Sequence, residues 1–227
     1  MTAPSAKPSL RLVLATNNSA KLAELTRILA AAHVDVRLAG LAEFPGAPEV
    51  AETGATFAEN ALLKARAIAG YTGLPAVADD SGLCVDALNG MPGVLSARWA
   101  GAHGDDEANL RLVLAQIADV PEERLGAQFV CAAALVVPLS GSERHRKETS
   151  AGQDEGKACR EQVSEGVVRG RLIREPRGEN GFGYDPIFVA DGQQITTAEM
   201  EPDAKDQISH RGRALRGLTP AIAALTG

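Results

Sequence analysis

The sequence predicts one α/β unit built on a long mixed β-sheet with flanking helices. Two observations carry this prediction. Apolar runs of strand length alternate with amphipathic segments early in the 227-residue chain, and strand-like segments then dominate its middle. A purely parallel sheet would require a helix between successive strands, so the middle of the chain indicates a mixed sheet. We find neither an internal repeat nor a coiled-coil heptad pattern.

The first predicted elements are a strand, a helix and a second strand. Residues 10–15 form a run that is apolar except at Arg11 and is typical of a buried strand. Residues 16–19 (Thr-Asn-Asn-Ser) can cap the start of a helix. Residues 34–38 are predicted to form the second strand. The helix between them carries apolar residues at helical spacing, namely Leu22, Leu25, Ile28 and Leu29.

A capping box marks the second helix. In residues 56–59 (Thr-Phe-Ala-Glu) the hydroxyl and the carboxylate can satisfy each other's backbone amides. Asn60 and Lys64 are four residues apart and share one face of this helix. Gly73 and Pro75 end the segment. The residues expected to face the core are Phe57, Leu62, Ala65 and Ile68.

Two adjacent carboxylates, Asp79 and Asp80, follow a short apolar strand at residues 76–78. We expect a tight turn at residues 81–82 (Ser-Gly) directly after them. Neighbouring like charges are unfavourable unless a cation neutralises them, and carboxylate oxygens at a strand end suit Mg²⁺. Taken alone, the four residues favour an ordinary surface turn over a metal site, and the other motifs of the chain reverse this preference.

Strand character dominates the middle of the chain. Residues 105–117 predict a helix that begins at either of its two leading aspartates, and residues 128–137 predict a central strand. Residues 140–162 are rich in charge and lack apolar periodicity, so we expect an exposed insertion there. Strand character resumes at residues 167–173.

The last part of the chain begins with a glycine-rich segment at residues 178–186, which a short strand at 187–189 follows. The final predicted helix begins after Ser209 and ends near Leu218. Thr219-Pro220 is expected to restart it, because proline cannot continue the hydrogen bonding of a helix interior.

Composition limits the class of protein. A hydrophobic content of 45% is enough for one sizeable core, which we place in a single domain over residues 10–227. The net charge of −6 argues against general binding to nucleic acid, because such binding relies on positive surface charge. A few lysines converging locally can still bind a small anion.

The cysteines and the apolar segments indicate a cytoplasmic protein without a membrane partner. The three cysteines show no CxxC spacing, so a disulfide framework or a zinc site is not expected. Residues 1–9 lack the apolar core of a secretory signal, and we expect a disordered leader there. The longest apolar run, residues 129–137, is too short to span a bilayer.

Three of five unusually polar segments point to a phosphate and a metal ion. Residues 16–21 place backbone amides and Lys21 at a helix start, an arrangement that suits an anion. The second segment comprises Glu52, Asn60 and Lys64, in which Glu52 could be a metal ligand and Lys64 could reach a phosphate. The third segment is the pair Asp79 and Asp80, already described.

The other two segments suit a nucleobase. Two glycines flank Phe182 in residues 181–186, so its ring could press onto a flat ligand or plug the core. Lys205 and residues 209–213 (Ser-His-Arg-Gly-Arg) supply donors for phosphate oxygens or a base carbonyl. Together the five segments predict a nucleoside triphosphate site. A serine or cysteine hydrolase fits poorly, since no nucleophile elbow or plausible Cys/His pair is present.

The same segments resemble the inosine triphosphate pyrophosphatase family, also called dITP/XTP pyrophosphatases. They occur in the family's order and span most of the chain. The segments are residues 14–21 (LATNNSAK), 52–66 (ETGATFAENALLKAR), 78–83 (ADDSGL), 181–186 (GFGYDP) and 209–212 (SHRG), and residues 90–98 (GMPGVLSAR) are also similar.

The resemblance implies a Mg²⁺-dependent hydrolysis of dITP, ITP or XTP to the monophosphate and pyrophosphate. It implies a homodimer and an elongated mixed sheet with two lobes and a central substrate cleft. By position, Asp80 matches the general base and a metal ligand, and Glu52 matches a second metal ligand. The positions matching substrate contacts are Thr16, Asn17, Asn18, Ser19, Ala20, Lys21, Lys64, Ser81, Phe182, Gly183, Tyr184, Asp185, Lys205, His210 and Arg211.

The chain departs from the family pattern at two places. The first loop lacks the glycine that is common there, although Lys21 is retained, and residues 140–162 are longer than the family leads us to expect. Three alternatives are a Maf-like pyrophosphatase acting on modified pyrimidine nucleotides, a nucleotide-binding module without turnover, and a purely structural protein. Base preference would distinguish the Maf-like pyrophosphatase, and the presence or absence of turnover would distinguish the binding module. Five co-occurring motifs argue against a purely structural protein.

Overall fold

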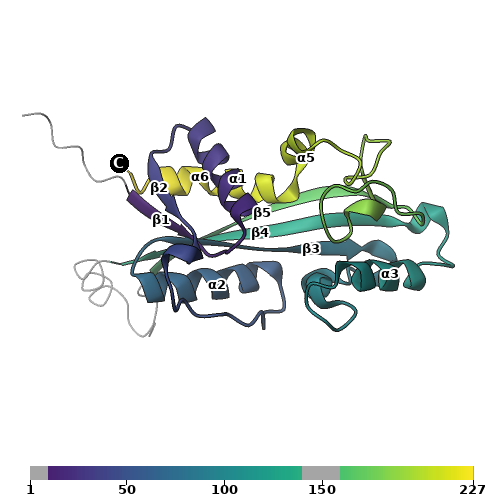
Figure 1. The fold of residues 1–227 in the computed structure, drawn as a ribbon, viewed down its shortest axis with the longest axis horizontal. Coiled ribbons are helices and arrows are strands. Elements are labelled where there is room, and N and C mark those ends of the chain that lie inside the picture. The colour runs from purple at the N-terminus through teal and green to yellow at the C-terminus, as the bar shows by residue number, and fades with distance from the viewer. Residues whose placement is uncertain (1–9, 140–158, 227) are drawn as a thin grey trace, which may run out of the picture.

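A computed structural model describes residues 10–139 and 159–226 (Figure 1). The predicted leader at residues 1–9 and most of the predicted insertion at 140–162 lie outside the described residues. No helix among the described residues is long and apolar enough to cross a membrane.

A six-stranded mixed sheet forms the centre of the described part of the chain and confirms the predicted α/β class. Its order is β2-β1-β3-β4-β5-β6, with β1 parallel to both neighbours and the other pairs antiparallel. The strands are β1 (Leu10–Leu14), β2 (Val36–Ala39), β3 (Ala76–Val85), β4 (Gly126–Pro138), β5 (Cys159–Leu172) and β6 (Phe188–Ala190). β3, β4 and β5 are long and give the molecule its elongated shape (Figure 1).

Helices cover both faces of the sheet. α1, α5 and α6 lie on one face, and α2 and α3 lie on the other (Figure 1). The helices are α1 (Ser19–Ala31), α2 (Phe57–Thr72), α3 (Asp106–Gln116), α5 (Pro202–Ile208) and α6 (His210–Ala223). Right-handed crossovers explain why α1 and α2 are on opposite faces, because the chain moves outward from β1 to β2 and returns past β1 to β3.

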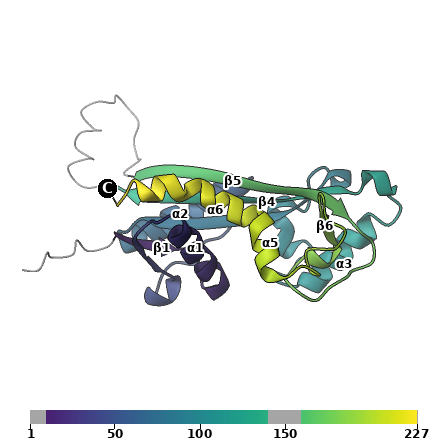
Figure 2. The same cartoon turned by 90° about the horizontal axis from the view of Figure 1, so that it is seen from above.

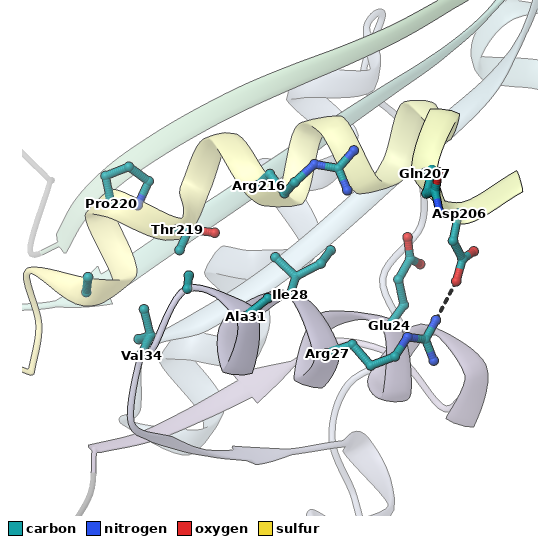
Figure 3. A pocket seen from close by; sticks show the side chains of 12 residues that line it. Glu24, Arg27, Ile28, Ala31, Val34, Asp206, Gln207, Arg216, Thr219 and Pro220 are labelled. Atoms are coloured by element: carbon teal, nitrogen blue, oxygen red, sulfur yellow. Dashed lines mark hydrogen bonds and ion pairs between the residues drawn. The ribbon is translucent and has the colours of Figure 1, made fainter. Parts of the chain in front are cut away.

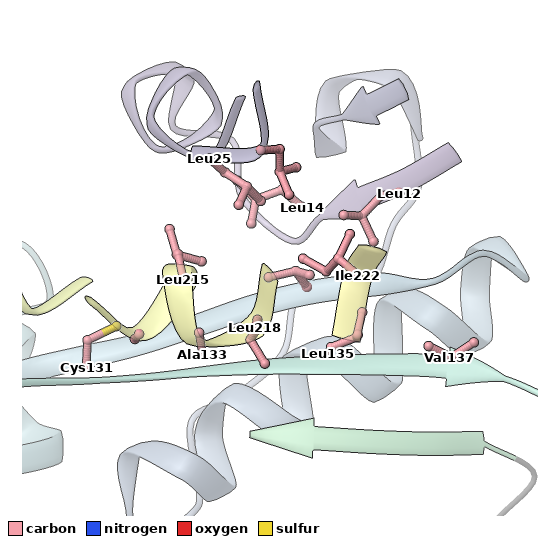
Figure 4. Close-up of a cluster of buried hydrophobic side chains, with 13 residues drawn as sticks. Leu12, Leu14, Leu25, Cys131, Ala133, Leu135, Val137, Leu215, Leu218 and Ile222 are labelled. Carbon is pink, nitrogen blue, oxygen red and sulfur yellow. The ribbon is translucent and has the colours of Figure 1, made fainter. Parts of the chain in front are cut away.

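The apolar core has one part on each face of the β1 half and a third part in the β6 half. α6 runs along β4 and β5 (Figure 2), and its leucines pack between this ribbon and β1 (Figure 4). The part drawn in Figure 4 includes Leu12, Leu14, Leu25, Cys131, Leu135, Leu215, Leu218 and Ile222. These contacts hold the carboxyl end of β1 against the first residues of β3.

The tight turn predicted at residues 81–82 is wrong. β3 continues to Val85, with Asp80 aligned on Ala132 and Gly82 on Val130 of β4. Glycine is required here for space, since a Cβ at position 82 would lie 2.3 Å from Ser96 Oγ. Pairing with a long neighbouring strand therefore outweighs the weak strand propensity of Asp, Ser and Gly.

Two other boundaries differ from the predictions. β5 begins at Cys159, so residues 159–162 belong to a strand rather than to the expected insertion, and Gln162 is aligned with Leu135. α6 continues through Pro220 to Ala223 instead of restarting there. Packing of Leu218 and Ile222 into the same core explains why the helix tolerates the proline.

Candidate active site

The two adjacent carboxylates point to opposite faces of the sheet. Successive side chains of a strand alternate between its faces, and β3 is regular at this point. Asp80 accordingly contacts α2, whereas Asp79 contacts residues of α1 and α6. The pair therefore does not form one joint metal site, and each carboxylate has a separate set of partners.

Asp80 lies in a polar cluster on the α2 face. Asn60 Nδ2 donates to Asp80 Oδ2 at 2.9 Å, and Lys64 Nζ lies 3.8 Å from Asp80 Oδ1. Helical spacing places Asn60 and Lys64 on one face of α2, as the sequence predicts. Burial raises the pKa of Asp80 above its usual value, although Lys64 and Asn60 act in the opposite sense. Asp80 is thus a stronger base than an exposed carboxylate.

Glu52 joins the same cluster from the loop before α2. Lys64 Nζ donates to Glu52 Oε1 at 2.8 Å, and Arg98 Nη1 donates to Glu52 Oε2 at 3.2 Å. Arg98 Nη2 also donates to the Glu52 carbonyl oxygen at 3.1 Å. Burial opposes the ionisation of Glu52, but Lys64 and Arg98 outweigh it and lower its pKa.

The chemistry of this cluster suits a hard divalent cation. Glu52 and Asp80 offer carboxylate oxygens alone, and the Lys64 ammonium already lies between them as a positive charge. The described residues hold no group of three or more His, Cys, Asp and Glu side chains that could bind a metal ion. Two protein carboxylates with room for water and phosphate oxygens are the usual ligation of Mg²⁺.

Asp79 is fully engaged on the opposite face. Lys21 Nζ donates to Asp79 Oδ2 at 2.6 Å, and Arg211 Nη2 donates to Asp79 Oδ1 at 3.3 Å. Arg211 also pairs with Glu24. Burial opposes the ionisation of Asp79, but the charges of Lys21 and Arg211 outweigh it and hold its pKa well below the usual range. Two cations assigned to substrate by resemblance are therefore paired with Asp79 here.

In the loop between β1 and α1, side chains accept hydrogen bonds from backbone amides of the same segment. Asn18 Oδ1 accepts from the amides of Ala20 and Lys21, at 2.9 and 3.3 Å. Thr16 Oγ1 accepts from the Asn18 amide at 3.1 Å. This confirms the predicted cap, and it occupies two of the amides that we expected to face an anion. Asn17, Asn18, Ser19 and Ala20 are exposed.

The glycine-rich loop presents one aromatic ring to solvent and buries another. Phe182 is 74% exposed, so the interpretation of its ring as a core plug is wrong. Lys205 Nζ lies 5.6 Å from the centroid of the Phe182 ring. Tyr184 is buried, and its hydroxyl donates to the Ser96 carbonyl at 2.9 Å. Of the two rings, Phe182 alone is placed to stack on a flat ligand.

Asp185 and Ser81 have different neighbours. Asp185 is buried and accepts from the Phe182 amide at 2.9 Å, from Thr197 Oγ1 at 2.7 Å and from Lys205. Its carboxylate thereby fixes the position of the loop beneath the exposed ring. Ser81 is half-buried and shares the face of Asp79, two residues before it on the strand.

His210 begins α6 and stacks on Phe129, with ring centroids 5.0 Å apart and an interplanar angle of 13°. Burial lowers the pKa of His210 from 6.5 to about 4, with Asp185 acting in the opposite sense. The imidazole is consequently neutral at pH 7 and offers one N–H donor.

We expect the free energy of unfolding to fall as the pH is lowered from about 6.5 to about 4. The unfolded chain binds a proton at His210 in this window and the folded chain does not, so acid favours unfolding. Urea denaturation across the window measures the slope. His210→Phe, which keeps a ring against Phe129, should flatten it, whereas exposed His103→Phe should not. Equal slopes in all three proteins would contradict the assignment.

Two contacts in the site escaped the sequence prediction of site residues. Asn60 was grouped with Glu52 and Lys64 in one polar segment but was assigned no role, yet it is fully buried against Asp80. Arg98 closes the segment at residues 90–98, and it reaches Glu52 across 46 positions of sequence. An asparagine among the apolar residues of a helix is a local sequence signal for a buried polar contact. No local sequence signal indicates the contact between Arg98 and Glu52.

A separate groove of about 670 Å³ lies between α1 and α6 (Figure 3). An ion pair between Arg27 and Asp206 lies at one end of it. None of the predicted site residues lines the groove, so it is distinct from the carboxylate cluster.

Comparisons with known proteins agree with one another. Residues 12–221 match the model of the Ham1 family. The chain is 54% identical over 217 residues to a Streptomyces coelicolor protein named dITP/XTP pyrophosphatase, covering 96% of this chain and 99% of that protein. It is 57% identical over 216 residues to a Nocardia farcinica protein of the same name, covering 95% and 96%.

Solved structures show the same relationship. The crystal structure of a nucleoside-triphosphatase, a dITP/XTP pyrophosphatase from Mycobacterium abscessus, is similar with a TM-score of 0.72 and 52% identity, covering 93% of this chain and 100% of that one. A HAM1 protein from Coxiella burnetii is similar with a TM-score of 0.78 and 40% identity, covering 95% and 99%.

Proposed function

This chain belongs to the Ham1 family, and on that premise we propose that it hydrolyses the non-canonical purine nucleotides dITP, ITP and XTP. The products are the nucleoside monophosphate and pyrophosphate, which makes the protein a nucleoside triphosphate diphosphatase that cleanses the nucleotide pool. The observation that carries the proposal is the buried Asp80 beside Glu52 and Lys64. Full-length similarity to relatives named dITP/XTP pyrophosphatase supports the substrate class.

Mg²⁺ is the proposed cofactor, and Glu52 and Asp80 would hold it. When bound, the ion supplies charge neutralisation at the triphosphate and activates water. The paired carboxylates and the intervening Lys64 ammonium support this assignment, because they show that a cation is stable at this point. Occupation of Glu52 and Asp80 by another cation would release Lys64 toward a substrate phosphate.

Asp80 is the proposed general base. It accepts a proton from the water that attacks the α-phosphorus, and the bond from that phosphorus to the oxygen of the leaving pyrophosphate breaks. Burial raises the pKa of Asp80, which strengthens it as a base. Lys64 lies within reach of Asp80 and stabilises negative charge on the phosphates.

The substrate is proposed to lie along the open edge of β3. Along this edge, β1 ends at Leu14, which is aligned with Val77 of β3. Farther along β3, Ser96 Oγ accepts a hydrogen bond from the Leu83 amide at 2.9 Å. Asp80 lies between these two contacts. A central cleft here would bring the residue 16–21 loop and the residue 181–186 loop to the two ends of one nucleotide.

The base end of the site is proposed to comprise Phe182, Lys205 and His210. The Phe182 ring is exposed and can stack, while Lys205 and a neutral His210 are donors. Hypoxanthine and xanthine carry an acceptor at position 6, whereas adenine carries an amino donor. A buried donor left unpaired costs about 1–3 kcal/mol, which disfavours adenine nucleotides.

Phe182→Ala is expected to raise KM for ITP by roughly tenfold, because stacking of a base on an aromatic ring contributes about 1–3 kcal/mol. The melting temperature should hardly change, since the ring is exposed. Steady-state kinetics and thermal denaturation measure both. Ile195→Ala removes another exposed apolar side chain and should leave KM unaltered. An unchanged KM in Phe182→Ala would contradict stacking.

Product analysis tests the function directly. The purified protein is incubated with Mg²⁺ and, separately, ITP, XTP, GTP and ATP. Monophosphate and pyrophosphate from ITP and XTP, with ATP and GTP largely spared, are expected. Orthophosphate as the product would contradict the proposed cleavage, indifference to the base would contradict the selectivity, and no turnover would favour a binding module.

We further propose a cytoplasmic homodimer that binds neither nucleic acid nor membrane. Cys84 and Cys131 are free thiols, which is consistent with a reducing compartment. Light scattering on the full chain tests the dimer, and a monomer at micromolar concentration would overturn it.

A further inference from the structure

Asn60 lies fully buried between Asp80 and the loop that carries Glu52, and both ends of its carboxamide form hydrogen bonds. Its Nδ2 donates to Asp80 Oδ2 at 2.9 Å, and its Oδ1 accepts from the Gly54 amide at 2.7 Å. A carboxamide has a donor and an acceptor on one planar group. An ionised carboxylate could not donate to Asp80, and an apolar side chain would remove the hydrogen bonds to both Asp80 Oδ2 and the Gly54 amide.

Gly54 shows how closely the loop approaches this carboxamide. Gly54 is two residues after Glu52, and a Cβ at position 54 would lie 2.8 Å from Asn60 Oδ1 and 2.6 Å from Glu59 Cβ. Space, rather than a left-handed backbone, is therefore the reason for glycine here. The approach allows one side chain to bond the Glu52 loop and Asp80 together.

We propose that Asn60 is a positioning residue that sets the geometry of Glu52 relative to Asp80. The hydrogen bond to Oδ2 orients the Asp80 carboxylate, and the hydrogen bond from Gly54 fixes the loop that carries Glu52. Partners that orient metal ligands in this way are worth about 10- to 100-fold in metal affinity or activity. The inference rests on the proposed function, which makes these carboxylates the metal ligands.

The same helix offers a matched control. Glu59 Oε2 accepts from the Ala55 amide at 2.6 Å, so Glu59 anchors the same loop. No hydrogen bond joins it to Asp80 in the described part of the chain. If loop anchoring were the whole role of Asn60, Glu59→Ala and Asn60→Ala would behave alike.

The experiment compares the full-length protein with Asn60→Ala and Glu59→Ala. Two quantities are measured: kcat and KM for ITP at saturating Mg²⁺, and the affinity for Mn²⁺ alone by electron paramagnetic resonance. Asn60→Ala should lose about 10- to 100-fold in kcat or Mn²⁺ affinity, with KM for ITP changed by less than about threefold. Glu59→Ala should lower the melting temperature but keep kcat and Mn²⁺ affinity within about twofold.

A second variant perturbs the hydrogen bond between Asn60 and the Gly54 amide from the side of the loop. Gly54→Ala leaves Asn60 intact but crowds its Oδ1, so it should reproduce the loss in Mn²⁺ affinity even if Asn60→Ala does not fold. Normal kcat and Mn²⁺ affinity in Asn60→Ala, or equal losses in Glu59→Ala, would overturn the proposal. If the unaltered protein does not hydrolyse ITP, the proposed function fails, and the Mn²⁺ titrations still decide the role of Asn60.

Discussion

Asp80→Asn is expected to lower kcat for ITP by about 100- to 10,000-fold, the usual contribution of a positioned general base. The amide is nearly the same size and can still accept the hydrogen bond from Asn60, so the fold should persist. It cannot take a proton from water at neutral pH, and it is a poorer metal ligand. Pyrophosphate release measures turnover, and equilibrium binding of ITP measures the affinity that should remain.

A control that also removes one negative charge separates the loss of the general base from the effect of a changed net charge. Asp35→Asn removes an exposed carboxylate between α1 and β2 and should leave kcat unchanged. Near-normal turnover in Asp80→Asn would remove Asp80 from the mechanism. Loss of ITP binding in step with kcat would instead assign it a role in binding alone.

Asp79→Asn is expected to destabilise the fold by about 3 kcal/mol, because it leaves the buried Arg211 and the partly exposed Lys21 without their shared anion. The estimate is at the low end for buried pairs, since Arg211 keeps Glu24. For a chain of this length that free energy lowers the melting temperature by roughly 6–12 °C. Urea and thermal denaturation at pH 7 measure the change.

The matched control is Asp206→Asn, which breaks an exposed pair with Arg27. Exposed pairs contribute about 0–1 kcal/mol, so little change in stability is expected there. A similar effect of the two substitutions would show that the Asp79 cluster is not a structural ion pair. Because Asp79 and Asp80 are neighbours, losing stability at one and turnover at the other would demonstrate their separate roles.

Local patterns were sufficient for much of the fold. The hydroxyl of Thr56 caps α2 as predicted, by accepting from the Glu59 amide at 3.1 Å. The other half of the capping box differs by one residue, since Glu59 accepts from Ala55 rather than from Thr56. Helical spacing placed Asn60 and Lys64 on one face, and both contact Asp80. These features depend on residues close in sequence, which is why the sequence predicts them.

The strand through the two aspartates could not be predicted in this way. Asp, Ser and Gly favour a turn locally, and only the pairing of β3 with β4 makes the segment extended. That pairing sends Asp79 and Asp80 to opposite faces. The sequence shows two adjacent charges, whereas the structure places the proposed base on one face and an ion-paired carboxylate on the other.

The α/β class, the order of the polar motifs and the helical face that carries Asn60 and Lys64 follow from local sequence patterns, because periodicity and capping are properties of neighbouring residues. The charges that meet in the folded protein are, by contrast, distant in the sequence. Arg211 reaches Asp79 across 132 positions and Arg98 reaches Glu52 across 46. Contacts at such separations depend on sheet register and helix packing, and no local pattern encodes these.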